Sequence, residues 1–227
     1  MQKIVPLSGY AGSAKKQKRV YAFVKRSFDI VASLAALLVL SPLFLVVSVI
    51  CALDTKGKPL FVQQRMGRNN VPFLVFKFRT MNVAAPREVA THKLENPDQY
   101  ISRVGETLRK LSIDELPQLI NVLIGNMSIV GPRPVVLTET DLIALRKRNG
   151  ANSIRPCITG LAQISGRDNV TIKEKAWLDG EYAANRSVLL DLRILFKSVG
   201  YVLKSKGICE GANPRISTCR EKTERSA

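Results

Sequence analysis

The segment 30-IVASLAALLVLSPLFLVVSVICAL-53 carries no charged side chain. A helix of this length reaches about 36 Å, and the hydrocarbon core of a bilayer is about 30 Å thick. A buried helix of a soluble protein would carry a polar stripe, which this segment lacks. A secretory signal fits poorly, because the apolar run is long, starts late and has no small-residue cleavage site after it. We therefore expect residues 30–53 to insert into a membrane.

The centre of this segment predicts a bend. Pro42 removes one backbone hydrogen bond and clashes with the carbonyl four residues earlier, and the Ser41 hydroxyl can bond the freed carbonyl. Basic residues favour the cytoplasmic side of a membrane. A re-entrant helix that enters and leaves by that side would satisfy both flanks, whereas a straight, kinked span remains the alternative. The flanking basic residues are Lys15, Lys16, Lys18, Arg19, Lys25 and Arg26 before the segment, and Lys56, Lys58, Arg65 and Arg68 after it.

Composition limits the chemistry that the chain can perform. The 227 residues suit one domain, or one domain with a membrane anchor. A net charge of +17 calls for an anionic partner, either nucleic acid, a phosphorylated ligand or an acidic membrane face. His92 is the only histidine, so a catalytic triad or a His-rich zinc site is excluded. The four cysteines have no C-x-x-C spacing, which favours a reducing, cytosolic setting over a disulfide framework.

The rest of the chain predicts an α+β fold that is mostly helical. Apolar runs at 59–64 and 72–81, with a Gly/Asn turn between them, predict a hairpin of short strands. The expected organisation is a re-entrant membrane helix, bent at Ser-Pro, followed by a compact cytoplasmic catalytic domain with short strands and amphipathic surface helices. Its parts are a basic flexible arm at 1–20, a membrane-associated domain at 21–205, helices near 101–110, 117–124, 138–148, 173–185 and 188–204, loops at 82–100, 125–134 and 155–167, and a disordered tail at 206–227.

Two adjacent acids in 112-SIDELPQL-119 have two possible roles. Ser112 and Glu115 have the spacing of a capping box, in which Glu115 would only cap a helix. Pro117 argues against that arrangement, because proline fits best as the first helical residue. The helix would then start after Asp114 and Glu115, whose position near its positive end would favour ionisation. A carboxylate with a lowered pKa, beside a second one that holds a divalent ion, is a plausible nucleophile toward phosphorus. Residue types alone leave capping and catalysis equally open.

Several cations lie at turns or strand ends fixed by proline and glycine. Arginine grips phosphate oxygens through two parallel hydrogen bonds, so rigid turns that present arginines favour phosphate binding. Neither a P-loop nor a G-x-G-x-x-G fingerprint occurs. These cations are Lys77, Arg79, Arg133, Arg155 and Arg167.

With these motifs, the sequence resembles the bacterial sugar transferases, which are monotopic phosphoglycosyl transferases. The resemblance covers roughly residues 21–205. It implies transfer of a phosphosugar from a nucleotide diphosphate sugar, usually a UDP-sugar, to a polyprenyl phosphate at the bacterial inner membrane. It also implies a re-entrant helix bent at Ser41-Pro42, and this chain is similar to the small form. The motifs that carry it are 25-KRSFDI-30, 77-KFRTM-81, 112-SIDELPQLINVLIGNMSIVGPRP-134, 154-IRPCITGLAQISGR-167 and 181-EYAANRSVLLDLRIL-195.

The resemblance also implies roles for individual residues. Asp114 matches the nucleophile, which would form a phosphosugar–aspartyl intermediate, and Glu115 matches its partner, with both acids at a magnesium ion. Cys157 departs from the family pattern, which usually has glycine there, so strain or reduced activity is expected if that position needs a positive φ. For substrate binding, Arg109 and Arg133 match phosphate-holding arginines, Lys77, Arg79, Arg155 and Arg167 belong to matched motifs, and Asp179 and Tyr182 are expected to contact the sugar nucleotide.

The expected partners are a UDP-sugar, a polyprenyl phosphate and an anionic phospholipid membrane. Nucleic acid is not expected, because stacking aromatics interleaved with the basic residues are sparse. The catalytic domain should face the cytoplasm. A membrane-anchored basic binding module and a metal-dependent UDP-sugar hydrolase are the alternatives. The sugar, the polysaccharide pathway and a homodimeric state are left open by the sequence.

Overall fold

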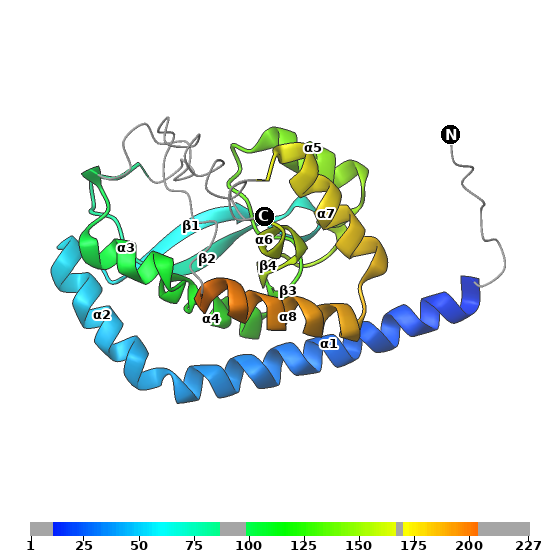
Figure 1. The fold of residues 1–227 in the computed structure, drawn as a ribbon, viewed down its shortest axis with the longest axis horizontal. Coiled ribbons are helices and arrows are strands. Elements are labelled where there is room, and N and C mark those ends of the chain that lie inside the picture. The colour runs from blue at the N-terminus through cyan, green and yellow to red at the C-terminus, as the bar shows by residue number, and fades with distance from the viewer. Residues whose placement is uncertain (1–10, 87–98, 167–169, 204–227) are drawn as a thin grey trace.

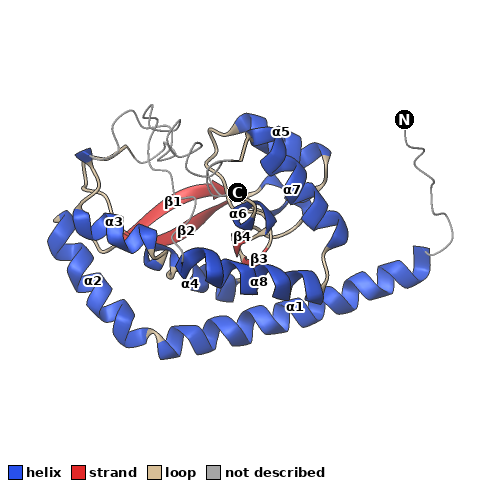
Figure 2. Cartoon of the chain, in the orientation of Figure 1, coloured by secondary structure: helices blue, strands red, loops and turns tan. Residues whose placement is uncertain are grey.

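The computed structural model describes residues 11–86, 99–166 and 170–203. Helices dominate this part of the chain, and the strands are few and short (Figures 1 and 2). The helices are α1 (Ala11–Val39), α2 (Ser41–Thr55), α3 (Arg103–Lys110), α4 (Gln118–Ile124), α5 (Thr140–Arg148), α6 (Leu161–Ile164), α7 (Ile172–Asn185) and α8 (Val188–Leu203), and the strands are β1 (Leu60–Met66), β2 (Pro72–Phe78), β3 (Ser128–Val130) and β4 (Cys157–Thr159). The predicted mostly helical α+β class is confirmed.

Helix α1 begins earlier than the sequence prediction. Residues 11–20 were expected in a flexible arm, but they form the first turns of α1. Their Ala, Lys, Gln and Arg content has high helix propensity, and extending an existing helix is far easier than nucleating one. The prediction of an arm was therefore wrong for these residues. Residues 1–10 and the predicted disordered tail at 206–227 lie outside the described residues.

The predicted bend lies between α1 and α2. Pro42 stands in the first turn of α2, and Ser41 Oγ donates to the Leu38 carbonyl at 2.8 Å. Leu38 is four residues before Pro42, so the serine satisfies the carbonyl that proline leaves without its usual donor. The part of α1 from Arg19 meets α2 at 66°, and Figure 1 shows the change of direction. Within the described residues, no single helix is long and apolar enough to cross a bilayer. The two helices of this bent pair together have the required length and apolar composition.

The hairpin of β1 and β2 matches the predicted apolar runs. The two strands pair antiparallel, with Phe61 opposite Lys77 and Arg65 opposite Phe73. Because strand residues alternate between faces, Lys77 shares one face of the hairpin with the odd-numbered residues of β1. Asn121 of α4 ties the helix to β2, since its side chain accepts from Phe76 N at 3.0 Å and donates to the Leu74 carbonyl at 2.7 Å.

A second, smaller sheet was not predicted. Strands β3 and β4 pair in parallel and join the two segments that were expected to be loops at 125–134 and 155–167. Gly131 N donates to the Thr159 carbonyl at 2.9 Å. A Cβ atom at Gly160 would collide with the Gly131 carbonyl, so only glycine permits this close crossing. Three-residue strands carry too short an alternation pattern to be recognised from sequence.

Helix α1 is anchored to the domain by a polar cluster. Asp191 of α8 accepts from Lys25 Nζ and Tyr21 Oη, each at 2.9 Å, through Oδ2. Tyr182 Oη of α7 lies 2.7 Å from the other oxygen of the same carboxylate and 3.1 Å from the Val130 carbonyl. Three helices, α1, α7 and α8, thus meet at one buried acid, and β3 joins them through Tyr182. Figure 1 shows α1 and α2 along one edge of the molecule, opposite α5 and α7.

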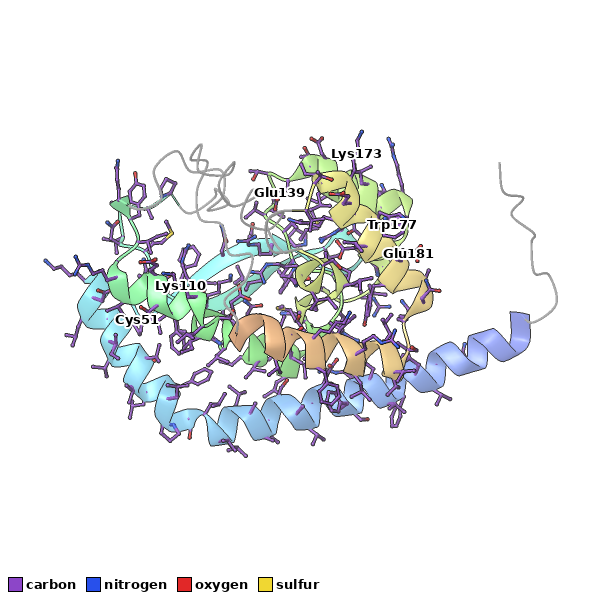
Figure 3. All side chains as sticks on the ribbon, in the orientation of Figure 1. Cys51, Lys110, Glu139, Lys173, Trp177 and Glu181 are labelled. Carbon is purple, nitrogen blue, oxygen red and sulfur yellow. The ribbon has the colours of Figure 1, made fainter. Side chains whose placement is uncertain are left out.

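Large apolar side chains remain exposed on the bent pair and on α8. Helix α8 turns Ile194 inward and leaves a row of apolar residues outside, which confirms its predicted amphipathic pattern. Helix α7 is solvated on its outer face, where Lys173, Trp177 and Glu181 stand four residues apart (Figure 3). The exposed apolar residues include Val31, Leu34, Leu38 and Val39 on α1, Leu45, Val46, Val49 and Leu53 on α2, and Leu189, Leu192, Phe196 and Val199 on α8.

Candidate active site

The two adjacent acids lie in a single 3-10 turn, Ile113–Glu115, between α3 and α4. Ser112 has a left-handed backbone, with φ of 56°, and its side chain caps nothing in this turn. Pro117 directly precedes α4, which agrees with the preference of proline for the start of a helix. The Glu115 side chain bonds to cations instead of to the backbone of Ser112, so the capping-box alternative is wrong.

Glu115 sits between two of the predicted cations. Lys77 Nζ of β2 donates to Glu115 Oε1 at 2.8 Å, and Arg133 Nη1 donates to Oε2 at 2.9 Å. Arg133 Nη2 also bonds Oε1, which makes the arginine contact a two-point one. Burial alone would raise the pKa of Glu115, but Arg133 and then Lys77 hold it well below its usual range. Burial in turn lowers the pKa of Lys77, and the Glu115 charge opposes that change.

Asp114 has the opposite electrostatic environment. Its side chain is 8% exposed, and desolvation raises its pKa to about 6. Lys77 opposes the rise, Glu115 adds to it, and Arg109 and Arg133 oppose it more weakly. The sequence predicted a lowered pKa near the start of α4, which was wrong because burial outweighs the nearby positive charges. A carboxylate of this kind is both ionisable near neutral pH and poorly hydrated.

The second limb of the bent pair contributes to the burial of Asp114. Val47 and Cys51 of α2 form one apolar cluster with Phe78 and Leu108, and Ile113 and Leu116 pack against it. Ile113 and Leu116 flank the two acids in sequence. Cys51 lies on α2 beside α3, the helix that ends at Lys110 (Figure 3). The apolar neighbours of Asp114 therefore come partly from the predicted membrane segment.

Arg109 completes the cations around Asp114. Its Nε donates to Thr80 Oγ1 at 2.9 Å, which orients the guanidinium at the end of β2. A Cβ atom at Gly105 would collide with the Thr80 carbonyl, so this glycine allows α3 to approach that strand end. Arg79, one residue earlier, donates to the Lys58 carbonyl at 2.8 Å and lies over the Phe61 ring. Arg79 and Arg109 thus have different partners at this end of the hairpin.

Arg155 lies at the opposite end of α4 from the acids. Its Nε donates to the Gly125 carbonyl at 2.8 Å, just after the last residue of that helix. Burial lowers its pKa, and the nearby cations Arg26 and Arg68 lower it further. Its place was predicted among phosphate-binding residues, but the observed contact is that of a helix C-terminal cap. Arg167 lies outside the described residues.

Asp179 and Tyr182 are buried in the core, each 1% exposed. Asp179 pairs with Arg146, whose Nε lies 2.8 Å from Oδ2, and Arg146 Nη1 donates to the Arg133 backbone carbonyl at 2.8 Å. Tyr182 belongs to the cluster around Asp191 described above. Both side chains were expected to contact the sugar nucleotide, but protein partners fill their polar positions. They support the segment that carries Arg133.

Cys157 fits its position without the expected strain. It lies in β4, has no positive φ, and is completely buried with its thiol against the Gly131 carbonyl. Burial raises the pKa of this thiol. An extended strand accepts any L residue, so the departure from glycine places no demand on the backbone.

Two residues of β1 belong near the site but were not predicted. Arg65 contributes to the lowered pKa of Lys77, and its Nε donates to Gln63 Oε1 at 2.9 Å. Gln63, Arg65 and Lys77 share one face of the hairpin. The sequence holds a signal for both residues. In a hairpin that pairs Phe61 with Lys77, alternation places Gln63 and Arg65 on the face of Lys77.

The two acids fit magnesium only in combination with a phosphate ligand. Among the described residues, no three His, Cys, Asp or Glu side chains lie close enough to hold a metal ion. Magnesium is usually bound by one or two carboxylates together with substrate phosphate oxygens. Asp114 and Glu115 supply two carboxylates that are adjacent in sequence, and both oxygens of Glu115 also accept from Lys77 and Arg133. This donor set suits a magnesium ion that a diphosphate brings with it.

The chemical capacity of the site follows from this arrangement. A poorly hydrated carboxylate stands beside a fixed carboxylate that gathers Lys77 and Arg133, with Arg109 nearby. Such a cluster can place an anionic phosphorus centre against a nucleophile and stabilise the charge that develops on its oxygens.

Comparison with known proteins identifies the family of this chain. The family model described as bacterial sugar transferase matches residues 20–205. An exopolysaccharide production protein ExoY of Sinorhizobium fredii is 42% identical over 197 residues, covering 81% of this chain and 87% of the relative. An undecaprenyl-phosphate glucose phosphotransferase of Komagataeibacter xylinus is 40% identical, covering 77% of this chain and 35% of the relative. A UDP-N-acetylgalactosamine-undecaprenyl-phosphate N-acetylgalactosaminephosphotransferase of Aeromonas hydrophila is 37% identical, covering 83% and 45%. The matched region holds every described element of the site, and the chain belongs to the bacterial sugar transferase family.

Proposed function

We propose that this protein transfers a sugar 1-phosphate from a UDP-sugar to a polyprenyl phosphate and releases UMP. The reaction would begin the assembly of an exopolysaccharide, O-antigen or other glycoconjugate. The names of its relatives support the reaction class. The observation that carries the proposal is the pair of acids, with Asp114 buried and poorly hydrated while Glu115 is fixed by Lys77 and Arg133.

The first step is attack by an Asp114 carboxylate oxygen on the phosphorus that bears the sugar. A bond forms between that oxygen and phosphorus, the bridging P–O bond to the uridine phosphate breaks, and UMP leaves with the bonding electrons. In the second step, an oxygen of the polyprenyl phosphate attacks the same phosphorus. The Asp114–phosphorus bond breaks, which regenerates the carboxylate and yields a polyprenyl diphosphate sugar. One pocket thus serves two substrates in turn, as in ping-pong kinetics.

The other side chains hold charge in place during both steps. Lys77 and Arg133 already converge on Glu115, within reach of any anion bound beside it. Arg109, oriented by Thr80, adds a third cation near Asp114. Preorganised cations stabilise the negative charge of a transferring phosphoryl group without reorganising at the moment of reaction. A magnesium ion held by Asp114, Glu115 and the diphosphate would offset the repulsion between carboxylate and substrate.

We further propose that α1 and α2 form a re-entrant membrane helix at the cytoplasmic face of the bacterial inner membrane. The 66° bend, the exposed apolar side chains of both limbs and the basic residues on both flanks support this arrangement. The exposed apolar row of α8 suits the interface with the headgroups. Such a placement would let a lipid phosphate and a soluble nucleotide sugar reach the same acids.

The test is UMP release from a panel of UDP-sugars by detergent-solubilised protein, with magnesium and polyprenyl phosphate present. One sugar should yield UMP and a lipid-linked product, and Asp114→Asn and chelation of the metal should each abolish both. Asp141→Asn is the matched control, because it removes an exposed acid from α5. Release of free sugar phosphate without a lipid product would establish a hydrolase instead. Full activity of Asp114→Asn would overturn the assignment of the nucleophile.

A further inference from the structure

The motif 25-KRSFDI-30 lies in α1, yet three of its side chains point into the catalytic domain. Lys25 bonds Asp191 of α8, and Asp29 accepts from Ser128 Oγ at 2.8 Å and Ile129 N at 3.1 Å. Arg26 donates through Nη1 to the Val122 carbonyl at 2.7 Å and through Nη2 to the Leu123 carbonyl at 2.9 Å. Lys25 and Asp29 anchor α1 to α8 and β3. Arg26 is the one of the three that bonds α4, the helix that follows the acids.

The contact of Arg26 with α4 satisfies the end of that helix. The last carbonyls of a helix have no partner within it. Arg26 bonds the carbonyls of Val122 and Leu123, of which the first also accepts from Gly125 N, and Arg155 bonds the Gly125 carbonyl. Helix α4 is about 10 Å long, so a displacement at one end moves the other end with it.

The same helix sets the distance between the acids and their cations. Asn121 of α4 is completely buried and bonds the backbone of β2 on both sides of Val75. Lys77 follows in the same strand and reaches Glu115 at 2.8 Å. On the other side of the turn, Val47 and Cys51 of α2 pack in the cluster that receives Ile113 and Leu116. The turn of the acids and the helix that follows it are therefore connected to both limbs of the bent pair, since α1 is hydrogen-bonded to α4 and α2 packs on the turn itself.

We propose that Arg26 is a positioning residue for phosphosugar transfer, which holds α4 so that Asp114 and Glu115 keep their places beside Lys77 and Arg133. This inference rests on the proposed function for its activity readout. It assigns to the bent helix pair a role in the geometry of the active site, in addition to attachment to a membrane.

The experiment compares Arg26→Ala and Arg26→Lys with Arg19→Ala. Arg19 is an exposed cation on the same helix, so its removal makes the same change in the charge of α1 without a contact to α4. Single-turnover UMP release should fall about 10- to 100-fold in Arg26→Ala, because small misplacements of reacting groups carry losses of this size. Arg26→Lys keeps the charge but loses the two-point contact, so its loss should be intermediate. Arg19→Ala should match the wild type.

A second readout separates positioning from general damage. Arg26 contacts α4 and not the UDP-sugar site, so kcat should fall in both Arg26 variants while the KM for the UDP-sugar stays close to the wild-type value. An unchanged rate, a loss confined to a raised KM, or an equal loss in Arg19→Ala would overturn the proposal.

A third measurement does not depend on turnover. Amide hydrogen exchange over residues 113–124 should be faster in Arg26→Ala than in the wild type and in Arg19→Ala, because the last turn of α4 loses two hydrogen bonds. If the wild type releases no UMP from any UDP-sugar, the proposed function fails while this comparison still decides the role of Arg26. Unchanged exchange over these residues in Arg26→Ala would refute the positioning role.

Discussion

Asp114 and Glu115 are neighbours in sequence, but their surroundings give them different ionisation. The two cations that contact Glu115 keep it charged, while desolvation raises the pKa of Asp114 to about 6. A nucleophile must be deprotonated, and it reacts faster when water does not surround it. The pair meets both requirements. Lys77 and Arg133 balance the charge of Glu115, and Asp114 is poorly hydrated and can ionise near neutral pH.

The raised pKa of Asp114 predicts a stability that depends on pH. The folded state binds this proton more tightly than the unfolded chain, so its stabilising effect is complete below the ordinary value of 3.8 and is lost as pH rises through about 6. At pH 8 the ionised group costs roughly 3 kcal/mol. Asp114→Asn should therefore be more stable than the wild type at pH 8 and nearly equal to it at pH 4.

Thermal unfolding of both proteins in detergent across this pH range measures that difference. Asp141→Asn should show no such pH dependence, because Asp141 is exposed. A variant that is less stable than the wild type at pH 8 would contradict the burial of a charged Asp114.

The two-point contact of Arg133 with Glu115 predicts that lysine cannot replace it. Arg133→Lys keeps one positive charge but cannot bond both oxygens of the carboxylate in one plane. We expect kcat/KM for UMP release to fall by about 10²-fold, the scale of losing one preorganised contact at a phosphoryl group. Arg148→Lys, an exposed change on α5, should leave it unchanged. Wild-type kinetics for Arg133→Lys would show that the two-point contact of Arg133 with Glu115 is not needed for activity.

At the scale of elements, the bend between α1 and α2 links the apolar helix pair to the site. The Ser41–Leu38 hydrogen bond and Pro42 create the change of direction, which brings Val47 and Cys51 onto the turn of the acids. A straight continuation of α1 would carry those side chains away from Ile113 and Leu116. Ser41 and Pro42 thus shape both the apolar helix pair and the surroundings of Asp114.

Pro42→Ala should straighten this break, because alanine restores the backbone N–H and removes the clash. We expect residue 58 to move to the opposite side of the membrane from the N-terminal flank and the activity to fall at least 10-fold. A membrane-impermeant maleimide, applied to Lys58→Cys in a cysteine-free background, reports the side in oriented vesicles. Val46→Ala, which changes an exposed side chain of α2, should leave both unchanged. Unaltered labelling in Pro42→Ala would contradict the role of proline in the bend.

The buried pair of Arg146 and Asp179 supports the segment that carries Arg133. Removing one partner of such a pair leaves an uncompensated charge, which costs about 3–5 kcal/mol. Asp179→Asn should lower the unfolding free energy by that amount without raising the KM for the UDP-sugar in the folded protein. Glu181→Gln, on the exposed face of α7, should change stability by less than about 0.5 kcal/mol. Normal stability with a raised KM would instead indicate a direct contact between Asp179 and the donor.

Sequence reasoning found the elements that local patterns specify. The hairpin, the bend at Ser41-Pro42 and the helix after Pro117 each follow from turn residues, proline chemistry or apolar spacing. It did not find the parallel pairing of β3 and β4, because that pairing depends on the crossing of Gly131 and Gly160 far apart in the chain. It also misjudged the pKa of Asp114 and did not foresee the contact of Arg155 with the end of α4. The first depends on burial and the second on the place of a distant segment, and both follow from packing between segments far apart in the chain.

At the scale of the whole molecule, charge and apolar surface suit the proposed boundary between water and lipid. The chain carries +17, and most of the described large apolar residues that remain exposed lie on α1, α2 and α8. The acids lie beside the bent pair, whereas α5 and α7 lie on the far side (Figure 1). Two substrates, one lipid-bound and one soluble, could meet at such a place, and a covalent intermediate would let them bind in succession.

The most direct test of this account is the intact mass of the protein after mixing with its UDP-sugar and magnesium, without polyprenyl phosphate. We predict one equivalent of UMP per protein and a mass increase of one phosphosugar, localised to Asp114 and absent in Asp114→Asn. Addition of polyprenyl phosphate should remove the added mass and produce the lipid-linked sugar. Turnover that requires both substrates together, with no adduct on the wild type, would contradict the covalent mechanism.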